Sequence, residues 1–155
     1  MALSSGYITQ KQAEIWEFKR KGCSESDIAR KLQVARQTVH KAADLANMGI
    51  EAALVEAANL NRIRIGKMDA AKGILQGRSI EFRTPVIVTF SSQNGLQVWY
   101  KHEADCQNCE RKESCKKALL TEMKNRDISL PEEARLMPPS KLAELLFKNI
   151  LGNNK

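Results

Sequence analysis

The sequence is poor in aromatic residues and contains no long hydrophobic run. Phe, Trp and Tyr make up 5% of its 155 residues, so a core must be built mainly from Leu, Ile, Val and Ala. No segment approaches the roughly 20 apolar residues that a membrane-spanning helix needs. Residues 1–6 also lack the basic start and apolar run of a secretory signal. We therefore expect a cytoplasmic protein with no membrane partner.

Common catalytic patterns are missing as well. The chain has no Gly-rich phosphate loop, no nucleophile elbow and no convincing pair of carboxylates. We therefore expect that it is not an enzyme and has no small-molecule substrate.

What the chain does contain is an excess of positive charge. There are 25 Lys and Arg residues against 18 Asp and Glu, which gives a formal net charge of +7. Hydrophobic residues make up 43% and charged residues 28%, so wholesale disorder is excluded. A folded basic protein of this length fits one or two small domains and favours an anionic partner such as nucleic acid.

Helix signals dominate the first third of the sequence. Thr9 can cap a helix over residues 10–21, which Gly22 would end. Ser24 or Ser26 can cap a short second helix after it.

A third helix is predicted from about residue 35 to 41. Ala-rich helical character continues over residues 50–60, and Gly49 is the expected break or bend between the two segments.

Beyond residue 61 the pattern changes to strands. Apolar and basic residues alternate over 62–65, which suits a half-exposed strand. Residues 86–90 and 97–100 are rich in strand-forming residues and flank Asn94-Gly95, a favoured hairpin dipeptide. The segment 66–77 is ambiguous between a short helix and a loop.

The C-terminal third contains two further helix patterns, over residues 116–126 and 140–150. The whole chain therefore reads as an α+β fold with a helical head, a small β-hairpin or sheet, a cysteine-rich loop and a helical tail. We predict a DNA-binding domain over residues 1–60 and a cysteine-rich domain for sensing and dimerisation over residues 61–155.

The segment from Ser26 to Val39 has the pattern of a helix-turn-helix. Ala29 is small enough to lie where two helices cross, while Leu32 and Val34 can face inward around the turn. The following helix then projects polar side chains of the types that bind guanine, adenine and phosphate in a major groove. The predicted DNA-binding residues are Arg36, Gln37, Thr38, His40 and Lys41.

A family resemblance supports this interpretation. Together with Ile8-Thr9, Gln12, Ile15-Trp16 and Gly22, the string resembles the helix-turn-helix of the LuxR and sigma-factor region 4 superfamily. Archaeal Tfx-type regulators of that superfamily join such a head to a small C-terminal domain. The resemblance covers about residues 7–46. It departs from the family at Gln33, where Gly is usual, and at Ala35, where a Ser cap is usual. The alternative is a three-helix core whose basic residues are only solvated.

Three of the four cysteines lie within ten residues and are preceded by a histidine, in the spacing His-x3-Cys-x2-Cys-x5-Cys. Such crowding in a reducing compartment favours a metal or cluster site over disulfides. Zinc accepts three thiolates and one imidazole, and an iron–sulfur cluster also takes thiolates with an occasional imidazole. Free or reversibly oxidised thiols are the third alternative. Cys23 is a distant candidate ligand, but a buried structural role suits it better.

The spacing is similar to the His-ligated four-iron cluster motif of iron-only hydrogenases and of the large electron-transfer subunit of respiratory complex I. Its cysteine part also looks like the motif of WhiB-type transcription regulators. This resemblance is confined to the loop and implies a 4Fe-4S cluster, with zinc as the alternative. The implied metal ligands are His102, Cys106, Cys109 and Cys115.

These signals combine into one functional hypothesis. We expect a transcription regulator of archaeal style that binds double-stranded DNA and whose iron–sulfur cluster senses redox state or oxygen. The alternative is a zinc-stapled DNA-binding or adaptor protein without a sensing role. A homodimer is expected because one helix-turn-helix contacts few base pairs. Candidate interfaces are residues 50–60 and the apolar tail residues Leu142, Leu145, Leu146 and Ile150, although we favour a core role for both.

Overall fold

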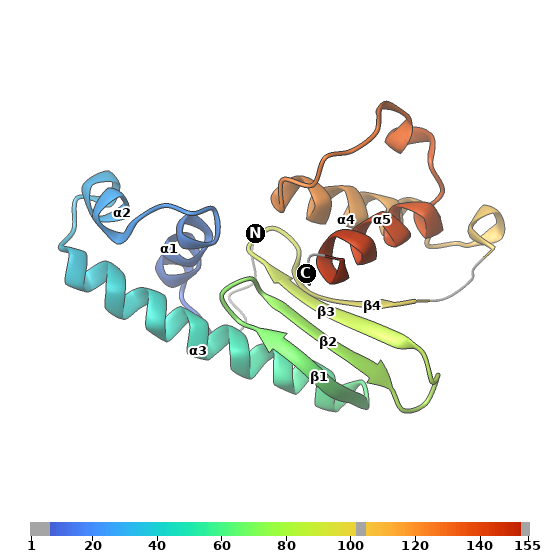
Figure 1. The fold of residues 1–155 in the computed structure, drawn as a ribbon, viewed down its shortest axis with the longest axis horizontal. Coiled ribbons are helices and arrows are strands. Elements are labelled where there is room, and N and C mark those ends of the chain that lie inside the picture. The colour runs from blue at the N-terminus through green and yellow to red at the C-terminus, as the bar shows by residue number, and fades with distance from the viewer. Residues whose placement is uncertain (1–6, 102–104, 153–155) are drawn as a thin grey trace. The chain divides into compact units, whose positions relative to one another are not determined.

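The computed structural model describes residues 7–101 and 105–152 and has an α+β fold (Figure 1). The N-terminal helices are α1 (Gln10–Arg20), α2 (Glu25–Leu32) and α3 (Arg36–Leu60). The strands are β1 (Ile63–Asp69), β2 (Ile74–Ser79), β3 (Pro85–Ser91) and β4 (Gly95–Tyr100). The C-terminal helices are α4 (Lys112–Asn125) and α5 (Pro139–Leu151), with short 3-10 helices η1 (Cys106–Asn108) and η2 (Glu132–Leu136). The predicted fold class is confirmed.

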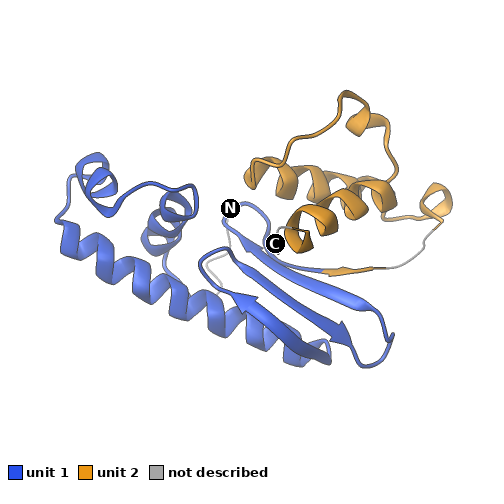
Figure 2. Cartoon of the chain, in the orientation of Figure 1, with its two compact units in different colours: residues 1–98 blue, residues 99–155 orange. Residues whose placement is uncertain are grey.

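The chain divides into two compact units, residues 1–98 and 99–155 (Figure 2). The division falls within β4, later than the domain boundary predicted after residue 60. The strands β1 to β3 therefore belong to the same unit as the N-terminal helices. In the described part of the chain, no helix is both long enough and apolar enough to cross a membrane.

The first two helices begin and end at the residues that the sequence indicates. Thr9 caps α1 through a capping box, in which its hydroxyl accepts from the Gln12 amide at 3.2 Å and its own amide donates to the Gln12 side chain at 2.9 Å. Gly22 follows α1 with a positive φ of 89°. Of the two candidate caps for α2, Ser24 is the one used, since its hydroxyl accepts from the Asp27 amide at 3.1 Å.

The predicted break at Gly49 is wrong, because α3 is one continuous helix of 25 residues. Glycine is required here because another backbone segment passes close to α3, and the helix does not bend at this residue. A Cβ at this position would collide with the carbonyl oxygen of Tyr7 and lie 2.5 Å from Cγ2 of Ile8. The missing side chain thus lets the segment before α1 cross the middle of α3.

The four strands form one antiparallel sheet in the order β1-β2-β3-β4. The segment 66–77, expected to be a helix or a loop, instead completes β1, turns and begins β2. Two of its three glycines, Gly66 and Gly77, interrupt the strand pattern. The register shifts between Ile65 and Lys67, around Gly66, and Gly77 pairs with Ile65 where a Cβ would lie 2.6 Å from Cγ2 of Ile63.

The core of the first unit lies between α3 and the sheet, as the ribbon view shows (Figure 1). The second half of α3 buries Ile50, Ala53, Leu54 and Ala58, and residues 86–91 of β3 are all buried. The core role favoured for residues 50–60 is therefore confirmed for these four side chains.

In the second unit, α4 and α5 pack against each other around Leu119, Met123, Leu142 and Leu146, each fully buried. Helix α4 begins earlier than predicted, at Lys112. Of the four tail residues offered as an interface, Leu142 and Leu146 are therefore core residues, whereas Leu145 and Ile150 are partly buried. The described residues of this unit also contain a buried ion pair, in which Nε of Arg126 lies 2.7 Å from the Glu122 carboxylate.

Candidate nucleic-acid interface and cysteine cluster

The helical head is held together by a small apolar core. Ile15 of α1, Ile28 and Ala29 of α2, and Val39 and Ala43 of α3 are all buried in one cluster. Leu32, Val34 and Cys23 pack against it as partly buried side chains. The predicted inward positions are therefore inward, and the structural role favoured for Cys23 agrees with its place beside this core.

The turn between α2 and α3 is tight and carries a left-handed residue. Gln33 has φ 54° and ψ 46°, and the following amide of Val34 donates to the Ala29 carbonyl at 3.0 Å. A left-handed residue is where glycine is most easily accommodated, so the conformation of Gln33 suits the glycine that the family resemblance would place here. Ala35 precedes α3 with no side-chain hydrogen bond to cap it.

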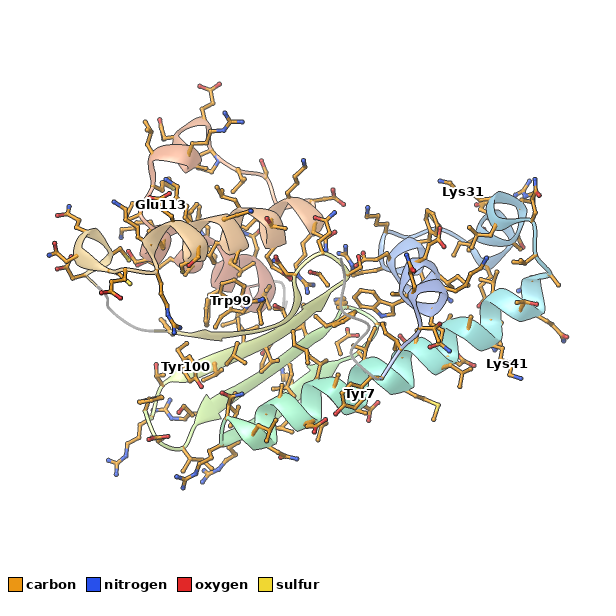
Figure 3. All side chains as sticks on the ribbon, turned by 180° about the vertical axis from the view of Figure 1, so that it is seen from behind. Tyr7, Lys31, Lys41, Trp99, Tyr100 and Glu113 are labelled. Atoms are coloured by element: carbon orange, nitrogen blue, oxygen red, sulfur yellow. The ribbon has the colours of Figure 1, made fainter. Side chains whose placement is uncertain are left out.

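All five predicted DNA-binding residues are exposed on the first two turns of α3. Arg36, Gln37 and Thr38 form its first turn, and beneath them Val39 is fully buried. Lys41 extends from α3 into solvent (Figure 3). The head thus supports α3 from inside and leaves guanidinium, amide, hydroxyl and ammonium groups free to meet a ligand from outside.

His40 differs from the other four because carboxylates surround it. Its Nδ1 lies 3.0 Å from Glu25 at the start of α2, and its Nε2 lies 3.3 Å from Asp44 one turn along α3. The hydrogen bond to Glu25 and the charge of Asp44 raise the pKa of His40. Lys19 of α1 also lies 3.1 Å from Glu25. His40 therefore links α2 to α3 and would have to release these partners to contact a base.

Two residues of α1, Trp16 and Glu17, fasten the head to the sheet through contacts that the sequence pattern does not indicate. The indole Nε1 of Trp16 donates to the Ala70 carbonyl at 3.0 Å, and its ring packs edge-on against Phe90 at 5.3 Å. Glu17 accepts from both the amide and the hydroxyl of Ser92, each at 3.0 Å. Burial would raise the pKa of Glu17, but hydrogen bonds from Ser92 and Arg20 lower it overall. No local spacing pattern reveals partners more than 50 residues apart in sequence.

The three clustered cysteines lie around the start of α4. Cys106 begins η1, where Asp105 accepts from the Gln107 amide at 3.1 Å, and Cys109 is exposed in the following turn. Cys115 lies in the first turns of α4, its amide donating to the Arg111 carbonyl at 2.8 Å. The predicted ligand His102 lies outside the described residues.

The Cys115 thiol is affected by its surroundings and by the other two cysteines. Burial raises the pKa of Cys115, and the neighbouring Cys106 and Cys109 raise it further. This thiol therefore keeps its proton more readily than a free cysteine. Within residues 7–101 and 105–152, no three His, Cys, Asp or Glu side chains are already gathered in a metal-binding arrangement. Thiolates that hold a metal would have to be deprotonated by it and drawn together.

Comparison with known protein families, with curated proteins and with solved structures finds no match for this chain.

Proposed function

We propose that this protein is a DNA-binding transcription regulator that inserts the first turns of α3 into the major groove of duplex DNA. The observation that carries the proposal is the array of Arg36, Gln37, Thr38 and Lys41, exposed above the fully buried Val39. Arg can bind the two acceptors of guanine, and Gln can bind adenine through a donor and an acceptor. Lys41 suits a phosphate, because an ammonium on a flexible stem acts as a point charge.

Charge around the array supports the same proposal. Residues 9–41 contain eight basic and four acidic residues. Positive charge beside a base-reading helix releases counterions from DNA and makes the affinity fall with salt. The role proposed for His40 is to position α2 against α3, since both of its ring nitrogens face carboxylates.

The test is a comparison of variants on a selected duplex and on random duplexes. Arg36→Ala and Gln37→Ala are expected to lower discrimination by about 1–3 kcal/mol at the base each one reads. Lys41→Ala is expected to weaken binding on every duplex and to reduce the salt slope by about 1. Lys124→Ala, which removes an exposed charge from α4, is the matched control and should change neither quantity. Equal losses on all duplexes from the first three variants would contradict base reading.

The cysteine cluster supports a second part of the proposal, a metal centre held by Cys106, Cys109 and Cys115 with His102 as the fourth ligand. The three cysteines lie within ten residues of one another, and such spacing favours a shared ligand over three isolated roles. An iron–sulfur cluster would supply redox chemistry, and its loss would change DNA affinity in a homodimer of this regulator. A zinc ion would supply only stability.

Metal content distinguishes these two. Protein purified without oxygen is expected to contain iron and acid-labile sulfide, and Cys106→Ser should lose both while the control Cys23→Ser keeps them. One zinc ion per chain without sulfide would favour a structural zinc site. DNA affinity measured before and after exposure to air then tests sensing, because unchanged affinity after loss of the cluster would reject it.

A further inference from the structure

Four arginines gather at one end of the sheet, far from the helix-turn-helix. Arg62 lies in the connection from α3 to β1, Arg64 in β1, Arg78 in β2, and Arg83 in the turn between β2 and β3. The amide of Ile80 donates to the Arg62 carbonyl at 3.0 Å, which brings the connection and the turn together. Figure 1 shows both at the same end of the sheet. We call these four residues the arginine cluster.

The register places two of them directly opposite each other. Arg64 pairs with Arg78 across antiparallel strands, so their side chains share one face of the sheet. Like charges in directly opposite positions destabilise a sheet. The neighbouring pair Ile63 and Ser79 is buried on the other face, which leaves the two exposed arginines on the face that Ile63 does not occupy.

No acid neutralises this cluster among residues 7–101 and 105–152. None of its four guanidinium groups lies within 4.0 Å of a carboxylate there. Arg78 instead donates to the Arg83 carbonyl at 2.6 Å, which holds its guanidinium at the turn. Residues 62–83 contain six basic and two acidic residues. Concentrated, unpaired arginine charge is the surface chemistry that phosphates complement.

Exposed apolar side chains lie on the same turn. Ile80 is 50% exposed and Phe82 is 65% exposed. Proteins that grip the DNA backbone often add apolar side chains that lie against the sugars or enter the minor groove. Arginine and exposed apolar residues together therefore suit duplex DNA better than a small free anion.

The cluster is too distant to share phosphates with the first turns of α3. Helix α3 has 25 residues, so at 1.5 Å per residue its two ends are about 37 Å apart. Phosphates held by the cluster are therefore not those that the first turns of α3 would contact.

We propose that the arginine cluster is a second DNA-binding surface, which holds the sugar-phosphate backbone of duplex DNA at a site separate from the bases contacted by α3. The proposal rests on the proposed function for the identity of its polyanion. It adds affinity without sequence information, because phosphates are the same at every base pair.

The experiment is a salt titration of the full-length protein on a 40-base-pair duplex of random sequence. The double variant Arg64→Gln with Arg78→Gln is expected to reduce the slope of log affinity against log salt by about 1.8, since each lost phosphate contact contributes about 0.9. Its thermal stability should stay close to that of the wild type, because removing the repulsion between the two arginines offsets the loss of the hydrogen bond from Arg78 to the Arg83 carbonyl.

The control is Lys124→Gln with Lys148→Gln, which removes the same charge from exposed positions of α4 and α5 and should leave the slope within 0.5 of wild type. An unchanged slope for the arginine variant overturns the proposal, while loss in Lys41→Ala would still uphold DNA reading by α3. If instead Lys41→Ala has no effect and the arginine variant loses affinity for DNA, the proposal for the helix-turn-helix is refuted and the proposal for the arginine cluster stands. Loss of binding to phosphatidylserine vesicles with an unchanged slope on DNA assigns the cluster to a lipid surface and also overturns the proposal.

Discussion

Replacing Gln33 by glycine should stabilise the protein, against the usual effect of introducing glycine. Gln33 has φ 54° and ψ 46° in the turn before α3, and a left-handed conformation costs a residue with a Cβ roughly 1–2 kcal/mol. Glycine removes that cost but loses roughly 0.5–1 kcal/mol of backbone entropy. The side chain is exposed, so little packing is lost. The expected net gain is about 0.5–1 kcal/mol, which corresponds to a Tm increase of roughly 2–3 °C.

Urea denaturation followed by circular dichroism measures this gain as a higher midpoint at an unchanged slope. Glu14→Gly is the matched control, because Glu14 is exposed inside α1 and glycine there should cost up to about 1 kcal/mol. Gln33→Val should also destabilise, since a β-branched residue disfavours positive φ. If Gln33→Gly lowers the midpoint as Glu14→Gly does, the left-handed turn assigned to the helix-turn-helix is wrong.

Two other predictions concern α3. Gly49→Ala should lower the free energy of unfolding in urea by about 1–3 kcal/mol, because its Cβ would collide with the Tyr7 carbonyl. The control is Asn59→Ala, exposed on the same helix, which should be neutral or slightly stabilising. If both variants raise the free energy of unfolding, the close approach of Tyr7 to Gly49 is wrong. His40 should titrate by NMR with a pKa above 6.5, since Glu25 and Asp44 favour its charged form. The stability that protonated His40 contributes is full below the ordinary histidine pKa and is lost as pH rises through the raised one. Glu25→Gln should lower the His40 midpoint, and an unchanged midpoint would show that the pair is not formed in solution.

Features determined by neighbours in sequence could be predicted. Thr9 and Gln12 form the capping box that a Thr followed three residues later by Gln indicates, and Gly22 ends α1 because only a residue without Cβ adopts φ 89° easily. The exposure of Arg36 and Gln37 over a buried Val39 likewise follows from helical periodicity.

Features determined by distant contacts could not be predicted. Gly49 looks like a break because helix propensity is local, whereas the reason for the glycine is the backbone of Tyr7, over 40 residues away. Gly66 and Gly77 conceal the strand pattern for a similar reason, since both lie where β1 and β2 approach closely. The arginine cluster escaped detection because it forms only when the register of β1 and β2 brings Arg64 opposite Arg78.

The continuity of α3 limits how a signal can reach the residues proposed to read DNA. One helix carries Arg36 at its start and buries Leu54 against the sheet, and Trp16 and Glu17 tie α1 to Ala70 and Ser92 of the same unit. Within the described residues of this unit, bending the head relative to the sheet would break buried contacts as well as these hydrogen bonds. A rearrangement inside the helix-turn-helix would cost much of the stability of the unit. We therefore expect a change at the cysteine cluster to alter DNA affinity by changing how whole units or whole chains are arranged.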